Sequence, residues 1–522
     1  MEETDSQKKA EQSGEEAQFG MGEAEGKPIP LTKWIGFFGG LLVFVLMLFS
    51  SPPENLSLAG WRTAAVALLM ATWWVTEVIP IFATALLPLV LFPIFGITDI
   101  DTAAAPYADP MIYLFLGGFI IAIAMKRWDL HRRIALGIIS FIGAKPRNII
   151  AGFIISSAFM SMWVSNTAAT MMMLPIGLSV IQLTKTGTQD PEKLRQNRNF
   201  ALALMLGIAY AANVGGLGTV IGTPTNALMI AFVSDAYNME ITFAQWMGLG
   251  VPVVILGLPI IFYSLTSIVF PVRLKTIPGG RKYIDEEMER LGNITRPEMI
   301  VGSVFTLVAT LWMTRPLLES YIPGLSDASI AIFGALLLFL IPVNMGKSVF
   351  IMRWKDAEEV PWGVLILFGG GLSLAGAIQR TGLAEWVGGY FSILGTWPVI
   401  LAIFVIAIII IMFTELASNS ATAAAFLPVI ASVAIGIGQD PLLFAIPITM
   451  VASCAFMLPV ATPPNAIVYG SGVMNIPQMV RAGLVLNLFF AMLITLLTYF
   501  LFTLFLGIDI GVVPEGISTL LS

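Results

Sequence analysis

The sequence predicts an all-α protein that crosses a lipid bilayer about 11 times. Of its 522 residues, 57% are hydrophobic and only 11% are charged, whereas a soluble domain needs roughly 25% charged residues to cover its surface. The apolar residues fall in stretches of about 17–25 residues, the length that spans the hydrocarbon core as a helix. Clear examples are Trp34–Ser50, Thr63–Ile79, Val251–Phe270, Met299–Thr314 and Ala482–Leu506.

The two ends of the chain differ from this apolar body. Residues 1–27 hold eight acidic and three basic residues without a long apolar run, so we expect a disordered cytoplasmic tail over 1–30. Neither a basic start nor an apolar core is present there, which argues against a secretory signal peptide. Residues 507–522 contain no lysine or arginine, and we expect them to be an external tail.

Single residues exclude several classes of site. One cysteine, Cys454, cannot form an internal disulfide framework, and one histidine, His131, cannot build a zinc site of several imidazoles. His131 lies among basic residues and is expected on the cytoplasmic surface. No glycine-rich nucleotide loop is visible, so ATP-driven pumping by this chain alone is not favoured.

The chain repeats itself at a fixed spacing. The motif Ser165-Asn166-Thr167 recurs as Ser418-Asn419-Ser420, 253 positions later (418 − 165), and Arg127, Leu130 and Pro175 recur at the same offset. A second motif, residues 223–227, matches residues 462–466 at an offset of 239 (462 − 223). A longer polar loop in the first copy accounts for the difference. An ordered series of matches indicates two related halves.

Basic residues indicate that the halves are inverted. Many lysines and arginines surround the first serine-asparagine motif, whereas none occurs between Arg380 and Arg481 around the second. Short cytoplasmic loops collect such residues. Corresponding loops should therefore lie on opposite sides of the membrane, as in the inverted repeats of secondary transporters.

Each half shows two polar interruptions of its apolar stretches. We interpret the first as the tip of a re-entrant helical hairpin and the second as the break in a discontinuous helix. The predicted organisation is an N-terminal half over 31–270, a cytoplasmic connector over 271–296 and a C-terminal half over 297–506. The hairpins are expected at about 146–182 and 395–437, and the broken helices at about 200–232 and 442–472.

The residue types at these interruptions suit a small anion together with cations. Hydroxyls and asparagine amides donate hydrogen bonds to carboxylate oxygens, and helices beginning at the tips point their positive ends at the same space. Asparagine, hydroxyl and freed backbone oxygens can coordinate a hard cation. No lysine, arginine or histidine lies in either tip or either proline break. Bound cations would then neutralise a dianion, which favours cotransport.

Two acidic residues also lie within apolar segments. Glu415 adjoins the second motif, and intramembrane acids are functional candidates by default. We expect Glu415 to position a helix or support the site rather than relay protons. Glu77 precedes Pro80 and is equally compatible with a structural place near an interface.

At these motifs the chain resembles the divalent anion:sodium symporter family of dicarboxylate and citrate transporters, over about residues 34–506. The run Ser453–Val468, the paired tips and the segment Trp73–Leu87 carry the resemblance. It implies a plasma-membrane homodimer with a scaffold and a moving transport domain, working by an elevator motion. It also implies import of succinate, malate or fumarate with two or more Na⁺ ions.

The resemblance further implies the site residues. A first sodium ion would be held by Ser161, Ser165, Asn166 and Gly222, and a second by Thr414, Ala417, Asn419 and Ala461. The substrate carboxylates would meet the two tips and the two breaks, namely Ser165, Asn166, Thr167, Thr223, Pro224, Ser418, Asn419, Ser420, Thr462 and Pro463. Ser420 departs from the threonine that many dicarboxylate carriers have.

Two other transport readings remain open beside a sodium-coupled dicarboxylate importer, and a passive channel is a further alternative. The chain could exchange dicarboxylates without sodium, or cotransport sulfate or citrate. A membrane enzyme would need a nucleophile with a base, and neither Cys454 nor His131 has a visible partner. No feature indicates nucleic-acid binding.

Overall fold

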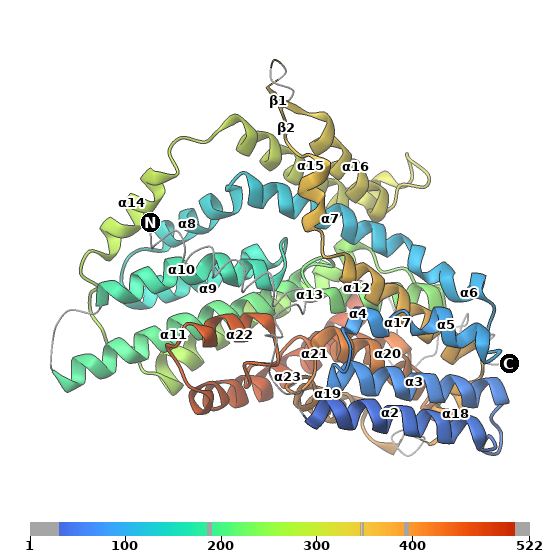
Figure 1. The fold of residues 1–522 in the computed structure, drawn as a ribbon. Helices are drawn as coiled ribbons and strands as arrows, with labels where there is room; N and C mark the ends of the chain where they lie inside the picture. Colours follow the sequence, from blue (N-terminus) through green and yellow to red (C-terminus); the bar gives the residue numbers. More distant parts are fainter. Residues whose placement is uncertain (1–30, 185–189, 345, 347–348, 391–395, 507–522) are drawn as a thin grey trace.

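A computed structural model describes residues 31–184, 190–344, 346, 349–390 and 396–506, so the predicted tails lie outside the described residues (Figure 1). The helices of the first half are α2 Leu31–Phe49, α3 Leu58–Thr76, α4 Ile81–Thr84, α5 Leu87–Ile94, α6 Ile100–Ala104, η1 Ala105–Ala108, α7 Pro110–Arg127, α8 Leu130–Ile142, α9 Pro146–Ser161, α10 Asn166–Thr184, α11 Pro191–Gly215, η2 Gly216–Gly218, α12 Pro224–Tyr237, α13 Phe243–Tyr263 and η3 Ser264–Val269, which is a π-helix.

The connector and the second half are also mainly helical. Their elements are α14 Gly280–Arg290, α15 Arg296–Leu318, α16 Asp327–Leu340, β1 Pro342–Asn344, β2 Val349–Phe350, η5 Trp354–Glu359, α17 Trp362–Arg380, α18 Leu383–Tyr390, α19 Val399–Thr414, α20 Asn419–Gly436, α21 Pro441–Ala452, α22 Pro463–Gly470 and α23 Ile476–Leu506. The two short strands pair antiparallel, with Pro342 opposite Phe350.

The predicted all-α membrane architecture is confirmed. The described residues contain 10 helices that are long and apolar enough to cross a bilayer, together with four shorter apolar stretches. Length and composition alone give this number, so it includes α10 and α20, which begin at the serine-asparagine motifs, and omits the 14-residue α16. The expected number of about 11 spans is therefore close to the 10 helices that meet these criteria among the described residues.

The core of the molecule is built from the two helices that precede the proline motifs. The most apolar 18-residue stretch of α11 and η2 is wholly buried, and every residue of α21 is buried. Around this core the halves interlock, because α10 packs against α11 and α22, while α20 packs against α21 and α12. Hairpin arms of one half therefore contact broken-helix segments of the other.

Proline determines where the second segment of each broken helix begins. Pro224 starts α12 and Pro463 starts α22, positions at which a missing backbone N–H is not needed. The preceding residues are forced into extended backbone, with φ −141° and ψ 143° at Thr223 and φ −141° and ψ 148° at Thr462. The two halves thus interrupt their central helices with nearly the same geometry.

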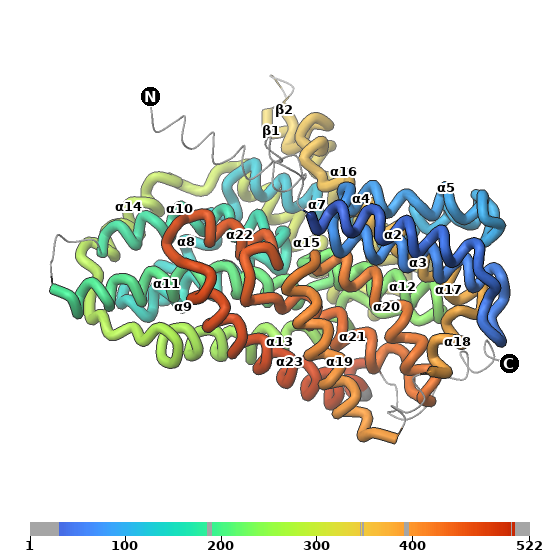
Figure 2. The backbone as a smooth tube through the Cα atoms, turned by 60° about the horizontal axis from the view of Figure 1, so that its bottom comes forward, coloured from blue at the N-terminus to red at the C-terminus, as the bar shows by residue number. Residues whose placement is uncertain are grey.

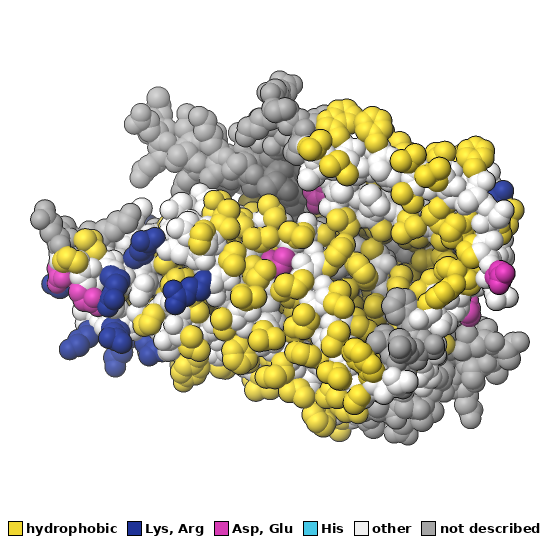
Figure 3. All heavy atoms as spheres, turned by 90° about the horizontal axis from the view of Figure 1, so that it is seen from below, with side chains coloured by type: hydrophobic (Ala, Val, Ile, Leu, Met, Phe, Trp, Pro, Cys, Tyr) yellow, Lys and Arg dark blue, Asp and Glu magenta, His cyan; other side chains and the backbone are white. Residues whose placement is uncertain are grey.

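Basic and hydrophobic side chains occupy different parts of the exterior. α13 and α23 run side by side along one edge, as Figure 2 shows. Lysine and arginine side chains gather at the end of the molecule where α11 begins, at the left of Figure 3, and hydrophobic side chains cover most of the remaining visible face. Such separation is typical of a protein whose belt faces lipid.

The prediction for His131 was wrong. Its side chain is 8% exposed, and Nδ1 lies 2.8 Å from the carbonyl oxygen of Met125. The amphipathic α8 packs against α14, where Arg132 Nη2 lies 2.5 Å from Glu287 Oε2. The histidine faces inward because the arginines that follow it occupy the polar side of α8.

Candidate functional site

Both serine-asparagine motifs lie at the start of a helix. α9 ends at Ser161 and α10 begins at Asn166, while α19 ends at Thr414 and α20 begins at Asn419. In each half the two helices pack against one another across this short turn. The six candidate substrate residues of the turns are half-buried and so accessible, namely Ser165, Asn166, Thr167, Ser418, Asn419 and Ser420.

The first candidate cation site is a cluster of oxygen atoms around Asn166. Its Oδ1 lies 2.5 Å from Ser161 Oγ, 3.2 Å from the carbonyl oxygen of Gly222 and 3.3 Å from that of Ala212. Turning the amide over would place its nitrogen among the same three oxygens and make hydrogen bonds to them. A hard cation at the centre would stabilise the oxygen-inward arrangement instead.

Close backbone approach requires glycine at this cluster. A Cβ atom on Gly222 would overlap the carbonyl oxygen of Gly216, and one on Gly216 would overlap Asn166 Oδ1. The sequence-predicted Gly222 is therefore brought next to Asn166. Ser161 is fully buried, so this cluster reaches deeper than the half-buried turn at Ser165. The Ser165 hydroxyl accepts the backbone N–H of Ala168 at 3.3 Å.

The second candidate cation site has a related form. Thr414 Oγ1 lies 2.9 Å from Asn419 Oδ1 and 2.8 Å from the carbonyl oxygen of Ala452. Thr414 and Asn419 stand 253 positions after Ser161 and Asn166 (414 − 161; 419 − 166), so corresponding residues form both clusters. Ala417 and Ala461 are buried, 4% and 2% exposed, and could contribute only carbonyl oxygens.

Two asparagines hold the unwound segments in matching ways. Asn226 Nδ2 donates to the carbonyl oxygens of Gly216 and Thr219 at 3.0 and 2.8 Å. Asn465 Nδ2 donates to those of Ala455 and Leu458, each at 3.0 Å. Both asparagines are fully buried, and all three pairs of positions are related by the offset of 239. Each amide thus replaces helical hydrogen bonds that the break removes.

Hydrogen bonds also join the two breaks. Asn213 Nδ2 donates to Thr462 Oγ1 at 3.1 Å, and the hydroxyls of Thr225 and Ser453 lie 2.7 Å apart. Thr223 is buried and its hydroxyl lies 3.4 Å from that of Thr225. The candidate substrate residues of the breaks, Thr223, Pro224, Thr462 and Pro463, are consequently part of one connected region.

Glu415 is the acidic group of this region and is 1% exposed. Its carboxylate accepts the backbone N–H groups of Phe456, Met457 and Leu458 at 2.7, 2.9 and 3.0 Å. Asn487 Nδ2 donates to the same carboxylate at 2.7 Å. These bonds attach the second tip to the second break and agree with a positioning role. Glu77, by contrast, is exposed at the end of α3 in left-handed backbone, with φ 46°.

The site combines positive helix ends with an absence of basic side chains. α10, α12, α20 and α22 all begin in the connected region, and each N-terminus offers free N–H groups and about half a positive charge. Residues 158–170, 212–226, 411–423 and 452–466 contain Glu415 but no lysine, arginine or histidine. Such an arrangement can bind a small anion, with cations held in the adjacent oxygen clusters.

Several residues of the region were missed by sequence reasoning. Asn213 and Asn487 are buried amides in apolar helices, and polar groups of that kind are a recognisable signal. Tyr210 donates to the carbonyl oxygen of Phe456 at 2.6 Å. The carbonyl groups of Ala212 and Ala452 carry no side-chain signal, so only the structure could reveal them.

The chain is similar to known membrane transporters over most of its length. Residues 31–508 match the family model described as the sodium:sulfate symporter transmembrane region. A sodium-dependent dicarboxylate transporter, SdcS, of Staphylococcus saprophyticus is 43% identical over 500 residues, covering 94% of this chain and 96% of the relative. SdcS of Staphylococcus aureus strain USA300 is 43% identical over 489 residues, covering 93% and 94%.

Solved structures support the fold. The Alcanivorax borkumensis YdaH transporter matches with a TM-score of 0.53 at 12% identity, over 91% of this chain and 99% of that one. Neisseria gonorrhoeae MtrF matches with 0.55 at 12% identity, over 93% and 97%. The extent of the family match confirms the resemblance seen in the motifs and places the chain among transporters rather than enzymes. The chain belongs to the sodium:sulfate symporter family.

Proposed function

We propose that this protein imports C4-dicarboxylates such as succinate, malate and fumarate, driven by cotransported Na⁺. The observation that carries the proposal is the convergence of four helix N-termini in a region without basic side chains. Each helix N-terminus supplies only about half a positive charge, and burying a dianion away from water is costly. Two bound cations would offset this cost better than the four helix ends alone. The printed activity of the SdcS relatives, sodium-dependent dicarboxylate transport, supports the same assignment.

The proposal assigns separate roles to the accessible and buried groups. The half-buried turns, with Thr223, Pro224, Thr462 and Pro463, bind the carboxylates, while the Asn166 and Asn419 oxygen clusters each bind one Na⁺. Asn166 and Asn419 belong to both sets, so cation and anion binding share two residues. This sharing would couple the binding of one to the binding of the other.

The wider setting is part of the same proposal. The protein works as a homodimer by an elevator motion, with its N-terminus in the cytoplasm and its C-terminus outside. The segregation of basic side chains at one end supports this orientation. Dimer and motion rest on the family resemblance.

Uptake of radiolabelled succinate into proteoliposomes tests the proposal. The vesicles contain no succinate, and an inward Na⁺ gradient is compared with an equal K⁺ gradient. Uptake that follows Na⁺ and is inhibited by unlabelled malate and fumarate is the expected result. Uptake that ignores Na⁺ and requires internal dicarboxylate would instead identify an exchanger. Inhibition by sulfate or citrate, but not by malate, would reassign the substrate.

A further inference from the structure

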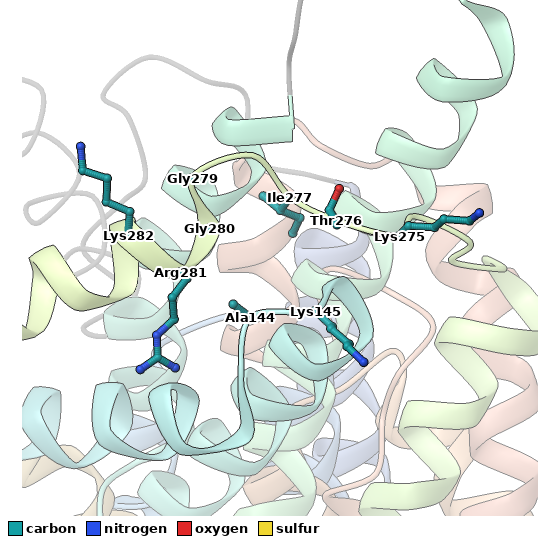
Figure 4. A pocket seen from close by; sticks show the side chains of 9 residues that line it. All are labelled: Ala144, Lys145, Lys275, Thr276, Ile277, Gly279, Gly280, Arg281 and Lys282. Atoms are coloured by element: carbon teal, nitrogen blue, oxygen red, sulfur yellow. The ribbon is translucent and has the colours of Figure 1, made fainter.

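A basic pocket lies where the turn between α8 and α9 meets the segment between α13 and α14. Its volume is about 450 Å³, and four of its nine lining residues are basic while none is acidic. Figure 4 shows the backbone of residues 276–280 arching over Ala144 and Lys145. Lys275 and Lys282 extend from opposite ends of this arch, and Arg281 points toward α8. The basic groups therefore surround the pocket at its rim.

Only part of this positive charge is neutralised by the protein. Arg281 Nε lies 3.1 Å from Asp285 Oδ2, and Lys282 Nζ lies 3.6 Å from Glu286 Oε1. Within the part of the chain that the structure describes, neither Lys145 nor Lys275 has a carboxylate within 4.0 Å. Two ammonium groups at the rim thus remain available to an anion.

Exposed apolar side chains lie on the elements that flank the pocket. Phe141, at the end of α8 and three residues before Ala144, is 92% exposed. Tyr263, at the end of α13, and Ile268, in η3, are 60% and 61% exposed and precede Lys275 in the chain. Large apolar groups with this exposure are expected to contact lipid tails in a membrane protein. The cationic rim consequently lies next to the edge of the apolar surface.

Arg147 marks the same boundary. Its guanidinium donates to Thr266 Oγ1 at 3.0 Å and to Ser267 Oγ at 2.5 Å, and its carbon lies 5.4 Å from the Phe262 ring centre. A guanidinium between an aromatic ring and hydroxyls is typical of the headgroup level of a bilayer.

We propose that this pocket binds the headgroup of an anionic phospholipid. The phosphodiester would lie between Lys145 and Lys275, and the acyl chains would run over Phe141 and Ile268. Basic pockets beside apolar helix ends recognise such lipids, each lysine adding to the attraction. The apolar neighbours favour a lipid over free phosphate, which would use only the rim.

Thermal unfolding of the purified full-length protein in detergent tests this site without reference to transport. Dioleoyl phosphatidylglycerol or dioleoyl phosphatidylcholine is titrated into the wild type and into Lys145→Gln/Lys275→Gln. The matched control, Lys193→Gln/Lys355→Gln, removes the same charge from exposed lysines outside the pocket. We expect phosphatidylglycerol to raise the unfolding midpoint of wild type and control, with affinity roughly 30-fold weaker in the pocket variant.

Two further arms identify the ligand. Phe141→Ser should weaken the response to phosphatidylglycerol, since its side chain contacts lipid tails in the proposal. Equal responses of the pocket variant and the control would overturn the site. If inorganic phosphate alone raises the midpoint, and Phe141→Ser does not change this, the lipid proposal is wrong and the pocket binds a free anion.

Discussion

The amide of Asn213 donates a hydrogen bond of 3.1 Å to Thr462 Oγ1, joining α11 of the first half to the start of α22 in the second. Thr462 Oγ1 also lies 3.3 Å from the backbone nitrogen of Asn465, which donates to it. Asn213 is fully buried and Thr462 is 2% exposed. One hydroxyl therefore holds both the local turn and the contact between the halves.

Replacing this hydroxyl should weaken substrate binding. Thr462→Val keeps the side-chain volume but leaves the two donors without their acceptor, at a cost of about 1–3 kcal/mol for each buried unpaired group. We expect the KM for succinate to rise roughly tenfold or more in proteoliposome uptake, and Thr462→Ser to restore most of it. An unchanged KM in Thr462→Val would show that this hydroxyl does not contribute to substrate binding.

The matching roles of Asn226 and Asn465 predict matching costs of substitution. Alanine at either position removes the amide donor from two carbonyl groups, of which those of Thr219 and Leu458 keep a backbone N–H partner. The loss should destabilise the fold by about 1–2 kcal/mol. We expect similar decreases of the thermal unfolding midpoint in detergent for the two variants. Asn293→Ala, at an exposed position, is the control and should have no effect. A decrease in only one half would show that the two breaks are not equivalent.

Glu415 should be essential for stability even without substrate. Glu415→Ala leaves three backbone N–H groups and the Asn487 amide unpaired, whereas Glu415→Gln keeps an acceptor oxygen for some of them. We expect the unfolding midpoint in sodium-free detergent to fall in the order wild type, Glu415→Gln, Glu415→Ala. The exposed Glu358→Ala is the control. A Glu415→Ala protein as stable as this control would contradict the positioning role.

Asp440 predicts a dependence of stability on pH. It caps α21, with Oδ1 accepting from the Leu442 backbone N–H at 2.7 Å, and burial raises the pKa of its carboxyl to about 6. The folded state then binds the proton more tightly than the unfolded state, so its contribution is fully present below pH 3.8 and is lost as pH rises through 6. Asp440→Asn retains an acceptor for the cap and removes the charge. We expect it to raise the unfolding midpoint more at pH 8 than at pH 5, because the carboxyl loses its stabilising contribution between pH 3.8 and about 6. Equal shifts at both pH values would contradict this.

Sequence patterns predicted the fold class because apolar length and the positions of proline are local properties. Pro224 and Pro463 determine where α12 and α22 begin, and the prediction of breaks at these positions needed no tertiary information. The offset of 253 likewise pairs Ser161 with Thr414 by their positions in the chain alone.

The remaining features depend on contacts between distant residues. Glu415 bonds to backbone groups at residues 456–458 and to Asn487, so its role is not visible in the residues beside it. The Ala212 carbonyl oxygen lies near Asn166 only because α11 packs against α9 and α10. His131 was misjudged because its basic neighbours suggested exposure, whereas the orientation of α8 buries it. The bounds of the two halves and the assignment of residues to each ion remain predictions.

The central claim is that each half supplies one Na⁺ site, and the Na⁺ dependence of succinate uptake tests it most directly. Ser161→Ala removes one oxygen from the first cluster, and Thr414→Ala removes one from the second. Uptake by wild-type proteoliposomes should rise with Na⁺ concentration with a Hill coefficient above one. Each variant should need more Na⁺ and show a coefficient closer to one. Wild-type Na⁺ dependence in both variants would contradict the account.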